Sequence, residues 1–571
     1  MMKIGYWNKL LIALTVTFVL SSCDLFELDI NDDPNNPTTA AINLLLSQAE
    51  LSLADNLEGG VNNNQLGFAG ILASGDNFQL AQNSYDGFWN NMYAGPLKDI
   101  EGIIQIASNP DALSPHYLGI GQLLKAYAFS TMVDLFGDIP YSEALKGDAA
   151  DAIKQPKFDN QATIYADALA LIDAAIANLS GTTPVIVTGD IIYGGNSTRW
   201  LKFARSLKLK LLIQTRQVNP TAKQDIEKIF TDGGLISTAA EDFQFQFSKL
   251  QSSNDVRHSW YENSYTLGVN DFTYILHQYM VEMLEDKDPR FPFYFRRQSK
   301  TVLDQNDPSQ RNTTPCSMTP GCLFGYVVLN ENLHQRIYGT TTLSQAQIDF
   351  LAGIFGRDRS DPAGVPQDAD FRTMPGVYPA AGRYDVTAPG LPGSFTAPGG
   401  GVFPILTHIN IDFYRIEAIL TLGIAGDARA LFETALRNHI TKVINFGVAA
   451  DANAVRPEQA DIDAYVNLWL TRYDNQTNND SKLNVVMKQF WFSSWGNGYE
   501  IYNAMRRTTD PNANNAFGYT GYPNTVQEPI LAPRKFPLRL PYPQQELSIN
   551  PNASSYTSVI YDQARLFWDA N

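Results

Sequence analysis

The chain has 571 residues, of which 42 are basic and 59 acidic, and its formal net charge is −17. Proteins that bind nucleic acid neutralise phosphates with clustered lysine and arginine, so this balance argues against a nucleic-acid partner. Aromatic residues make up 12% of the chain and charged residues 18%. That composition is typical both of large cores and of proteins that stack rings on uncharged ligands. The length allows a sizeable buried core.

Residues 1–22 have the pattern of a secretory signal. A basic start is followed by an apolar run from Leu10 to Leu20, which is too short to span a bilayer. The segment ends in Leu20-Ser21-Ser22-Cys23, which resembles the lipobox of bacterial lipoproteins. The sequence therefore predicts a mature protein outside the cytoplasm that is anchored through lipid on Cys23. An ordinary signal peptide with an incidental cysteine is the alternative.

Residues 23–40 are acidic and rich in proline and asparagine, which predicts an extended tether. We expect a single domain over residues 41–571, with no further stretch of the roughly twenty apolar residues that a membrane span needs. Apolar residues recur at helical spacing in much of this domain. These stretches are Leu44–Leu57, Tyr117–Phe136, Tyr165–Leu179, Trp200–Leu211, Ile409–Leu422, Ala428–Phe446 and Leu483–Met505. They favour a mainly α fold on a tetratricopeptide-like helical-repeat scaffold, although no strict repeat period occurs.

From about residue 256 to residue 404 the helical periodicity is broken, and proline and glycine recur every few residues in its second half. Such long irregular segments are usually functional or disordered. We expect this loop-rich insert to pack over the helices as ordered loops. It contains Cys316 and Cys322, which are close enough in sequence to form a small disulfide loop in an oxidising compartment. Metal ligation by this pair is less favoured because no further ligand with zinc spacing follows.

The common catalytic and metal-binding motifs are missing from the sequence. The six histidines form no His-x-x-x-His pair. No glycine-rich phosphate loop and no Gly-x-Ser-x-Gly elbow occurs. Nothing singles out a glycosidase carboxylate pair among the 59 acidic residues. We therefore predict a protein that binds rather than catalyses, with no metal and no cofactor.

An oligosaccharide site needs aromatic faces for the apolar ring carbons and amide or acid side chains for the hydroxyls. Two stretches combine these residue types, and the one ranked first lies at the start of the irregular insert. Any single ring in them is more typical of a core residue than of a ligand contact. The ligand-binding candidates are Trp260, Tyr261, Asn263 and Tyr265 in the first stretch, and Asn77, Phe78 and Tyr85 in the second.

Two other polar clusters favour a structural interpretation. The basic residues between Arg199 and Lys210 have the spacing of the solvated side of an amphipathic helix. Asn62-Asn63-Asn64 is typical of a turn. We do not predict a ligand site at either cluster.

Several motifs follow one another along most of the chain. They are Leu123-Leu124-Lys125-Ala126-Tyr127, Leu135-Phe136-Gly137-Asp138-Ile139-Pro140-Tyr141, Pro156-Lys157-Phe158-Asp159-Asn160-Gln161, Trp200-Leu201-Lys202-Phe203-Ala204-Arg205 and Phe536-Pro537-Leu538-Arg539-Leu540-Pro541. Together they resemble the SusD/RagB family of nutrient-binding outer-membrane lipoproteins. None of these residues is thereby a ligand contact. Gly137, for example, is expected to end a helix, and Asp138 to cap or turn.

The resemblance implies a mostly α-helical protein that is exposed at the cell surface and anchored in the outer membrane. Its implied partner is a SusC-like TonB-dependent β-barrel transporter, on which it lies as a lid. It would deliver a nutrient to this barrel, commonly an oligosaccharide or polysaccharide. A peptide-binding member of the same family and a helical-repeat scaffold without a small ligand remain as alternatives.

Overall fold

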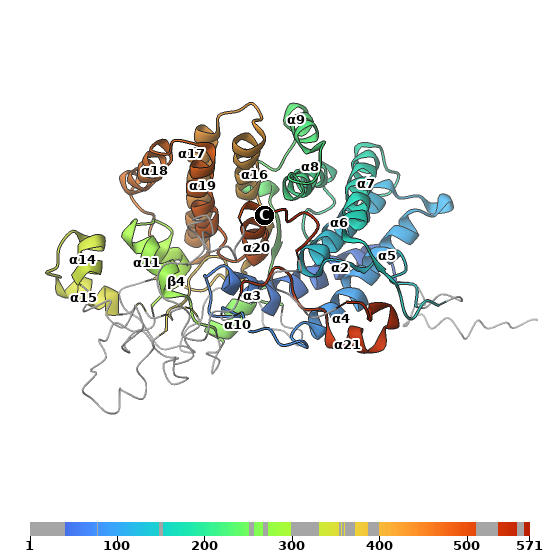
Figure 1. The fold of residues 1–571 in the computed structure, drawn as a ribbon, viewed down its shortest axis with the longest axis horizontal. Helices are drawn as coiled ribbons and strands as arrows, with labels where there is room; N and C mark the ends of the chain where they lie inside the picture. Colours follow the sequence, from blue (N-terminus) through green and yellow to red (C-terminus); the bar gives the residue numbers. More distant parts are fainter. Residues whose placement is uncertain are drawn as a thin grey trace, which may run out of the picture.

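The computed structural model describes residues 40–76, 78–147, 152–249, 256–266, 272–297, 331–352, 354, 356, 359, 372–385, 399–509, 535–556 and 565–571. Within them the chain is mainly helical (Figure 1). The α-helices are α2 (Ile42–Glu58), α3 (Gly60–Phe68), α4 (Asp86–Ala94), α5 (Pro96–Ala107), α6 (Pro115–Phe136), α7 (Gln161–Ser180), α8 (Ser197–Gln214), α9 (Ala222–Asp232), α10 (Ser259–Tyr265), α11 (His277–Glu285), α12 (Phe291–Tyr294), α14 (Glu331–Tyr338), α15 (Gln345–Ala352), α16 (His408–Leu422), α17 (Ala428–Ala450), α18 (Gln459–Asp474), α19 (Asn479–Ser493), α20 (Gly498–Thr508) and α21 (Gln544–Ile549).

The described strands form small antiparallel pairs. In two of the three pairs the two strands come from distant parts of the chain, so these pairs hold separate segments together. The pairs are β1 (Ile139–Pro140) with β2 (Phe158–Asp159), β3 (Phe243–Gln246) with β6 (Val402–Leu406), and β4 (Phe295–Arg296) with β5 (Met374–Pro375).

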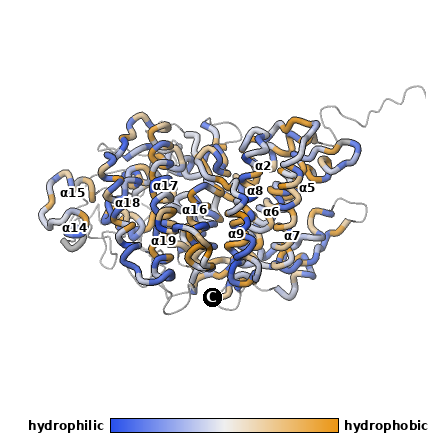
Figure 2. The backbone as a smooth tube through the Cα atoms, turned by 90° about the horizontal axis from the view of Figure 1, so that it is seen from above, coloured by the Kyte–Doolittle hydropathy of each residue, from blue (hydrophilic) through white to orange (hydrophobic). Residues whose placement is uncertain are grey.

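The longer helices form a row across the molecule (Figure 1). In this row α2 packs against α5, α5 against α6, α6 against α7 and α7 against α8; α8 then contacts α16, and α17 and α18 follow. The buried positions of α7 recur at helical spacing, which is why this segment packs along one face. Figure 2 shows hydrophobic and hydrophilic segments alternating along these helices. The mainly α, helical-repeat fold expected from the sequence is confirmed.

By length and composition alone, α7 is the one described helix that could cross a membrane. The periodicity of the sequence predicted no such segment. In the structure α7 lies between α6 and α8, with Ile164, Ile172 and Leu179 buried. Its buried apolar side chains are therefore covered by packing along one face of the helix.

Local sequence signals set several helix boundaries. Gly137 ends α6 with φ 91°, a conformation that glycine adopts without steric cost, as expected. Asp427 begins α17, where its carboxylate accepts from the backbone N–H of Ala430 at 3.0 Å. Thr407 begins α16 in a reciprocal capping box with Asn410.

The stretch Leu483–Met505, which the periodicity predicted as one helix, is two helices. Between α19 and α20 the backbone turns at Gly496, whose φ is 98°. Asn497 then caps α20 by accepting from the N–H of Tyr499 at 3.1 Å. The prediction was wrong because both helices bury apolar side chains, so the pattern continues across the break.

Asn62-Asn63-Asn64 lies inside α3 and not in a turn. The Asn62 side chain is buried, donates to the carbonyl of Gly496 at 3.1 Å and accepts from the N–H of Gly498 at 2.6 Å. Buried amides of this kind need partners. Here the partners come from the turn before α20 and from the first residue of α20, so a tertiary contact overrides the local turn preference.

Lys210 does not lie on the solvated side of α8, although the sequence predicted that position for all the basic residues from Arg199 to Lys210. Its ammonium is buried and forms an ion pair with Glu500 of α20, whose other oxygen accepts from the Tyr414 hydroxyl. A buried charge requires such a partner. The sequence pattern could not show it, because Lys210 and Glu500 are 290 positions apart.

The described part of the irregular insert is more helical than the sequence predicted. It contains the short helices α10, α11, α12, α14 and α15, and β6 returns to pair with β3. These short helices are held by buried rings such as Phe293 and Phe295. Cys23, Cys316 and Cys322 lie outside the described residues.

Candidate ligand-binding site

The first stretch predicted to contact ligand lies in the core. Trp260 is fully buried, donates its indole N–H to Asn63 Oδ1 at 2.8 Å and packs on Trp495, with ring centroids 4.7 Å apart. Tyr265 is buried and donates its hydroxyl to the carbonyl of Pro375 at 2.6 Å. These rings present no open face to solvent.

The remaining candidates have similar surroundings. Tyr261 is buried and stacks on Tyr265, and Asn263 is half-buried. Tyr85 is buried, and its hydroxyl accepts from the Asn64 amide at 3.2 Å. Phe78 is buried with its ring 5.5 Å from that of Phe536. Asn77 lies outside the described residues. The rings have the contacts of core residues, and their direct role in ligand binding remains a prediction.

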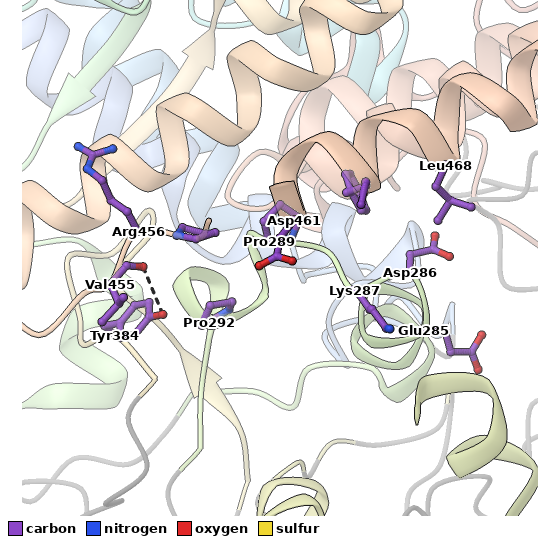
Figure 3. A pocket seen from close by; sticks show the side chains of 13 residues that line it. Glu285, Asp286, Lys287, Pro289, Pro292, Tyr384, Val455, Arg456, Asp461 and Leu468 are labelled. Carbon is purple, nitrogen blue, oxygen red and sulfur yellow. Dashed lines mark hydrogen bonds between the residues drawn. The ribbon is translucent and has the colours of Figure 1, made fainter. Parts of the chain in front are cut away.

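An open groove of about 630 Å³ lies elsewhere, beside α18 (Figure 3). We call it the α18 groove. Its volume falls within the range of about 300–1,000 Å³ that is usual for ligand sites. Its walls come from the turn between α11 and α12, from the segments around positions 384 and 456, and from one side of α18. The lining residues are Glu285, Asp286, Lys287, Pro289, Pro292, Tyr384, Val455, Arg456, Pro457, Asp461, Ala464, Tyr465 and Leu468.

Apolar side chains are exposed on the walls of the α18 groove. Val455 is 65% exposed and Leu468 is 36% exposed. Tyr384 is half-buried, with its ring packed edge-on against Phe293 at 4.9 Å between centroids. Three prolines complete the walls without offering backbone N–H groups. A ligand that covered these surfaces would gain free energy by removing them from water.

Part of the charge on the rim is already paired. Glu285 pairs with Arg336 at 2.6 Å, and Asp286 pairs with Arg472 through two contacts of 2.6 Å. Burial raises the pKa of Asp286, and the guanidinium of Arg472 offsets part of that rise. The groove residues Lys287 and Asp461 are exposed and form no ion pair within the described part of the chain. Lys287 thus offers a positive group to a ligand, and Asp461 offers a negative group.

One of the lining residues of the groove, Tyr465, belongs to a buried hydrogen-bond network. Tyr465, which lines the groove, donates its hydroxyl to Asp288 at 2.7 Å, and Arg290 donates to the same carboxylate at 2.8 Å. Arg290 also donates to Nδ1 of His439 at 2.7 Å. Burial, together with the nearby Arg290 cation, holds the pKa of His439 well below its usual value. The network fixes α12, α17 and α18 relative to one another and keeps the groove in shape.

The sequence did not single out the groove, although it contains a signal. In α18 the buried stripe is formed by Tyr465, Val466, Trp469, Leu470 and Tyr473. Leu468 lies beside this stripe, and Val455 stands between Ala454 and Arg456 in the loop before α18. Exposed apolar residues that lie together mark candidate contact surfaces. The described residues hold no cluster of three or more His, Cys, Asp or Glu side chains that could bind a metal.

The row of paired helices and the open groove define a helical-repeat protein with a concave site on its surface. Residues 34–353 match the SusD-like family whose description is starch-binding and associating with the outer membrane. The chain belongs to this family, which confirms the resemblance to SusD/RagB proteins. The family consists of binding proteins that are associated with the outer membrane.

Solved structures share this fold. A SusD-like protein from Bacteroidetes superposes with a TM-score of 0.66 at 18% identity, over 93% of this chain and 100% of that one. A SusD homologue from Bacteroides fragilis gives 0.63 at 18% identity, over 91% and 99%. A chitin-binding protein gives 0.64 at 18% identity, over 93% and 100%. At this identity the likeness shows the fold alone. Among curated proteins, no sequence matches the chain.

Proposed function

We propose that this protein captures a nutrient at the outer face of the outer membrane, without transforming it, and that the nutrient binds in the α18 groove. The observation that carries this proposal is the exposure of Val455, Leu468 and Tyr384 in one concave site beside the unpaired charges of Lys287 and Asp461. Apolar walls with a few polar groups are the usual composition of ligand pockets.

We favour an oligosaccharide as the ligand. A sugar ring offers an apolar face to Tyr384 and the aliphatic walls, and its hydroxyls suit the charged groups at the rim. The description of the family as starch-binding and the likeness to a chitin-binding protein support this choice. The aliphatic walls also suit the side chains of a peptide, so a peptide-binding member of the family is the second candidate.

Two substitutions on α18 test the groove. Ala464 lines it and is exposed, so Ala464→Trp should fill it. Asn467→Trp is the matched control, because Asn467 is exposed on the same helix outside the groove. Calorimetry against a panel of oligosaccharides and a panel of peptides should show a loss of at least about tenfold in affinity for Ala464→Trp alone, equivalent to about 1.4 kcal/mol. Equal affinities for the two variants would reject the groove, and binding only to peptides would reject the glycan.

We also propose that the chain is lipid-anchored through Cys23 and acts as the lid of a SusC-like TonB-dependent β-barrel transporter. The lipobox-like sequence and the family membership support this arrangement. Purification from detergent-solubilised membranes at native level should recover a β-barrel partner, and recovery as a lone monomer would contradict the lid. Cys23→Ala should release the protein from the membrane fraction.

The disulfide between Cys316 and Cys322 is a separate proposal that rests on their spacing. Mass spectrometry of unreduced peptides should find the two cysteines linked. Two free thiols in protein from the native compartment would contradict it.

A further inference from the structure

A second cavity, of about 380 Å³, lies between α17, the β3–β6 sheet and residues 237–239. We call it the α17 cavity. Unlike the α18 groove, it is lined mainly by uncharged polar side chains, with the half-buried ring of Phe446 beside them. The polar, uncharged side chains are Ser237, Thr238, Gln244, Asn438, Thr441 and Asn445.

The charged groups at the floor of the α17 cavity are paired with one another. Lys442 donates to Asp242 at 2.7 Å and to the amide oxygen of Gln244 at 3.0 Å. His408 Nδ1 lies 2.8 Å from the other oxygen of Asp242. Burial would raise the pKa of Asp242, but Lys442 and His408 outweigh it and lower that pKa. The wall is therefore left with amides and hydroxyls, which both donate and accept, as sugar hydroxyls do.

The α17 cavity and the α18 groove meet at one hydrogen bond. Asn445 lines the cavity and Arg456 lines the groove, and Arg456 Nη1 donates to Asn445 Oδ1 at 2.9 Å. Both residues are exposed, so the bond lies at the surface where the two depressions adjoin. From Asn438 to Asn445 the cavity follows α17 for about 10 Å at the helical rise of 1.5 Å per residue.

We infer that the two depressions form one continuous binding path for a linear, hydroxyl-rich oligomer, which crosses from the α18 groove to the α17 cavity over the Arg456–Asn445 hydrogen bond. The inference rests on the proposed function and narrows its ligand class. A single sugar unit occupies only one depression, whereas a longer chain occupies both. Once the first units are bound, the following units are held at high effective concentration beside the second depression. Affinity therefore rises with chain length.

The experiment uses maltooligosaccharides and chito-oligosaccharides, each from the disaccharide to the hexasaccharide, with calorimetry on the full mature protein. Thr441→Trp fills the α17 cavity from the helix side, and Ala430→Trp is its control on the same exposed face, about two helical turns beyond Asn438. For whichever of the two oligosaccharide series binds, the wild type and Ala430→Trp should bind the hexasaccharide more tightly than the disaccharide. Thr441→Trp should lose about tenfold in hexasaccharide affinity while keeping disaccharide affinity, a change of about 1.4 kcal/mol.

Thr238→Trp fills the same cavity from the opposite wall, so the test does not depend on one variant folding. Thermal midpoints close to that of the wild type establish which variants are folded. Disaccharide affinity equal to hexasaccharide affinity in the wild type would overturn the inference, as would unchanged hexasaccharide binding in the folded cavity variants. Lack of binding to both series at every length would instead contradict the proposed oligosaccharide function, and the inference with it.

Discussion

The indole N–H of Trp260 donates to Asn63 Oδ1 at 2.8 Å and so ties α10 to α3, although the two residues are 197 positions apart in sequence. The next asparagine, Asn64, donates to the hydroxyl of buried Tyr85. Two of the rings that the sequence marked as ligand contacts are thus held in the core by neighbouring amides of α3. Through Trp260, one of them fastens the start of the insert to the scaffold.

Trp260→Ala should therefore destabilise the fold. Removing a large buried aromatic side chain typically costs about 3–5 kcal/mol in the free energy of unfolding. Urea unfolding followed by circular dichroism measures the change. Ile186→Ala is the control, because Ile186 is 84% exposed and such a substitution should stay within about 0.5 kcal/mol. Unchanged stability together with lost oligosaccharide binding would instead identify Trp260 as a ligand contact.

Glu417 is buried between two arginines, and its neutralisation should be costly. It accepts from Arg507 through two contacts of 2.9 Å and lies 3.0 Å from Arg216. Burial alone would raise the pKa of Glu417, but the two guanidinium groups outweigh burial and lower that pKa. Glu417→Gln leaves buried positive charge without its partner, and this should lower the free energy of unfolding by about 3–5 kcal/mol.

Asp474→Asn is the matched control for Glu417→Gln. Asp474 pairs with Arg429 at 2.7 Å, but both side chains are nearly half exposed. Exposed ion pairs contribute about 1 kcal/mol or less. Denaturant unfolding of the two variants should separate them clearly. If both variants lost the same free energy of unfolding, burial would not govern the strength of the Glu417 contacts.

His439 should make stability depend on pH. Burial and the neighbouring Arg290 hold its pKa well below the ordinary value of 6.5. As the pH falls below 6.5, the unfolded chain takes up a proton at this position and the folded chain does not, so stability is present above that pH and is lost below it.

His439→Asn keeps an acceptor near Arg290 but removes this proton uptake. Between about pH 7.5 and about pH 5.5, its thermal midpoint should fall less than that of the wild type, because the unfolded variant gains no proton at this position. Calorimetric melts at the two pH values measure the difference. The same fall in both proteins would exclude His439 as the cause.

The sequence predicted the helices whose apolar spacing is continuous. The end of α6 and the start of α17 follow from apolar periodicity and from local signals at Gly137 and Asp427, which act within one helical turn. The break between α19 and α20 escaped prediction because the apolar pattern runs through it. The burial of Asn62 and Lys210 escaped because their partners, Gly498 and Glu500, are far along the chain.

The candidate site was not predictable in the same way. The α18 groove joins the turn after α11, the segment at Tyr384 and one side of α18, and no local pattern brings these segments together. Composition identified aromatic residues next to amides, which is a reasonable signal for a sugar site. It could not tell the buried ring of Trp260 from the half-exposed ring of Tyr384.

The sequence by itself determined the helical scaffold and the SusD-like family, because helical periodicity, caps and family motifs are written in residues close together in the chain. The tertiary structure alone decided which rings are buried, which charges are paired and where the groove opens. The physical reason is that burial and pairing depend on contacts between segments hundreds of residues apart, such as that between Asn62 and Gly498.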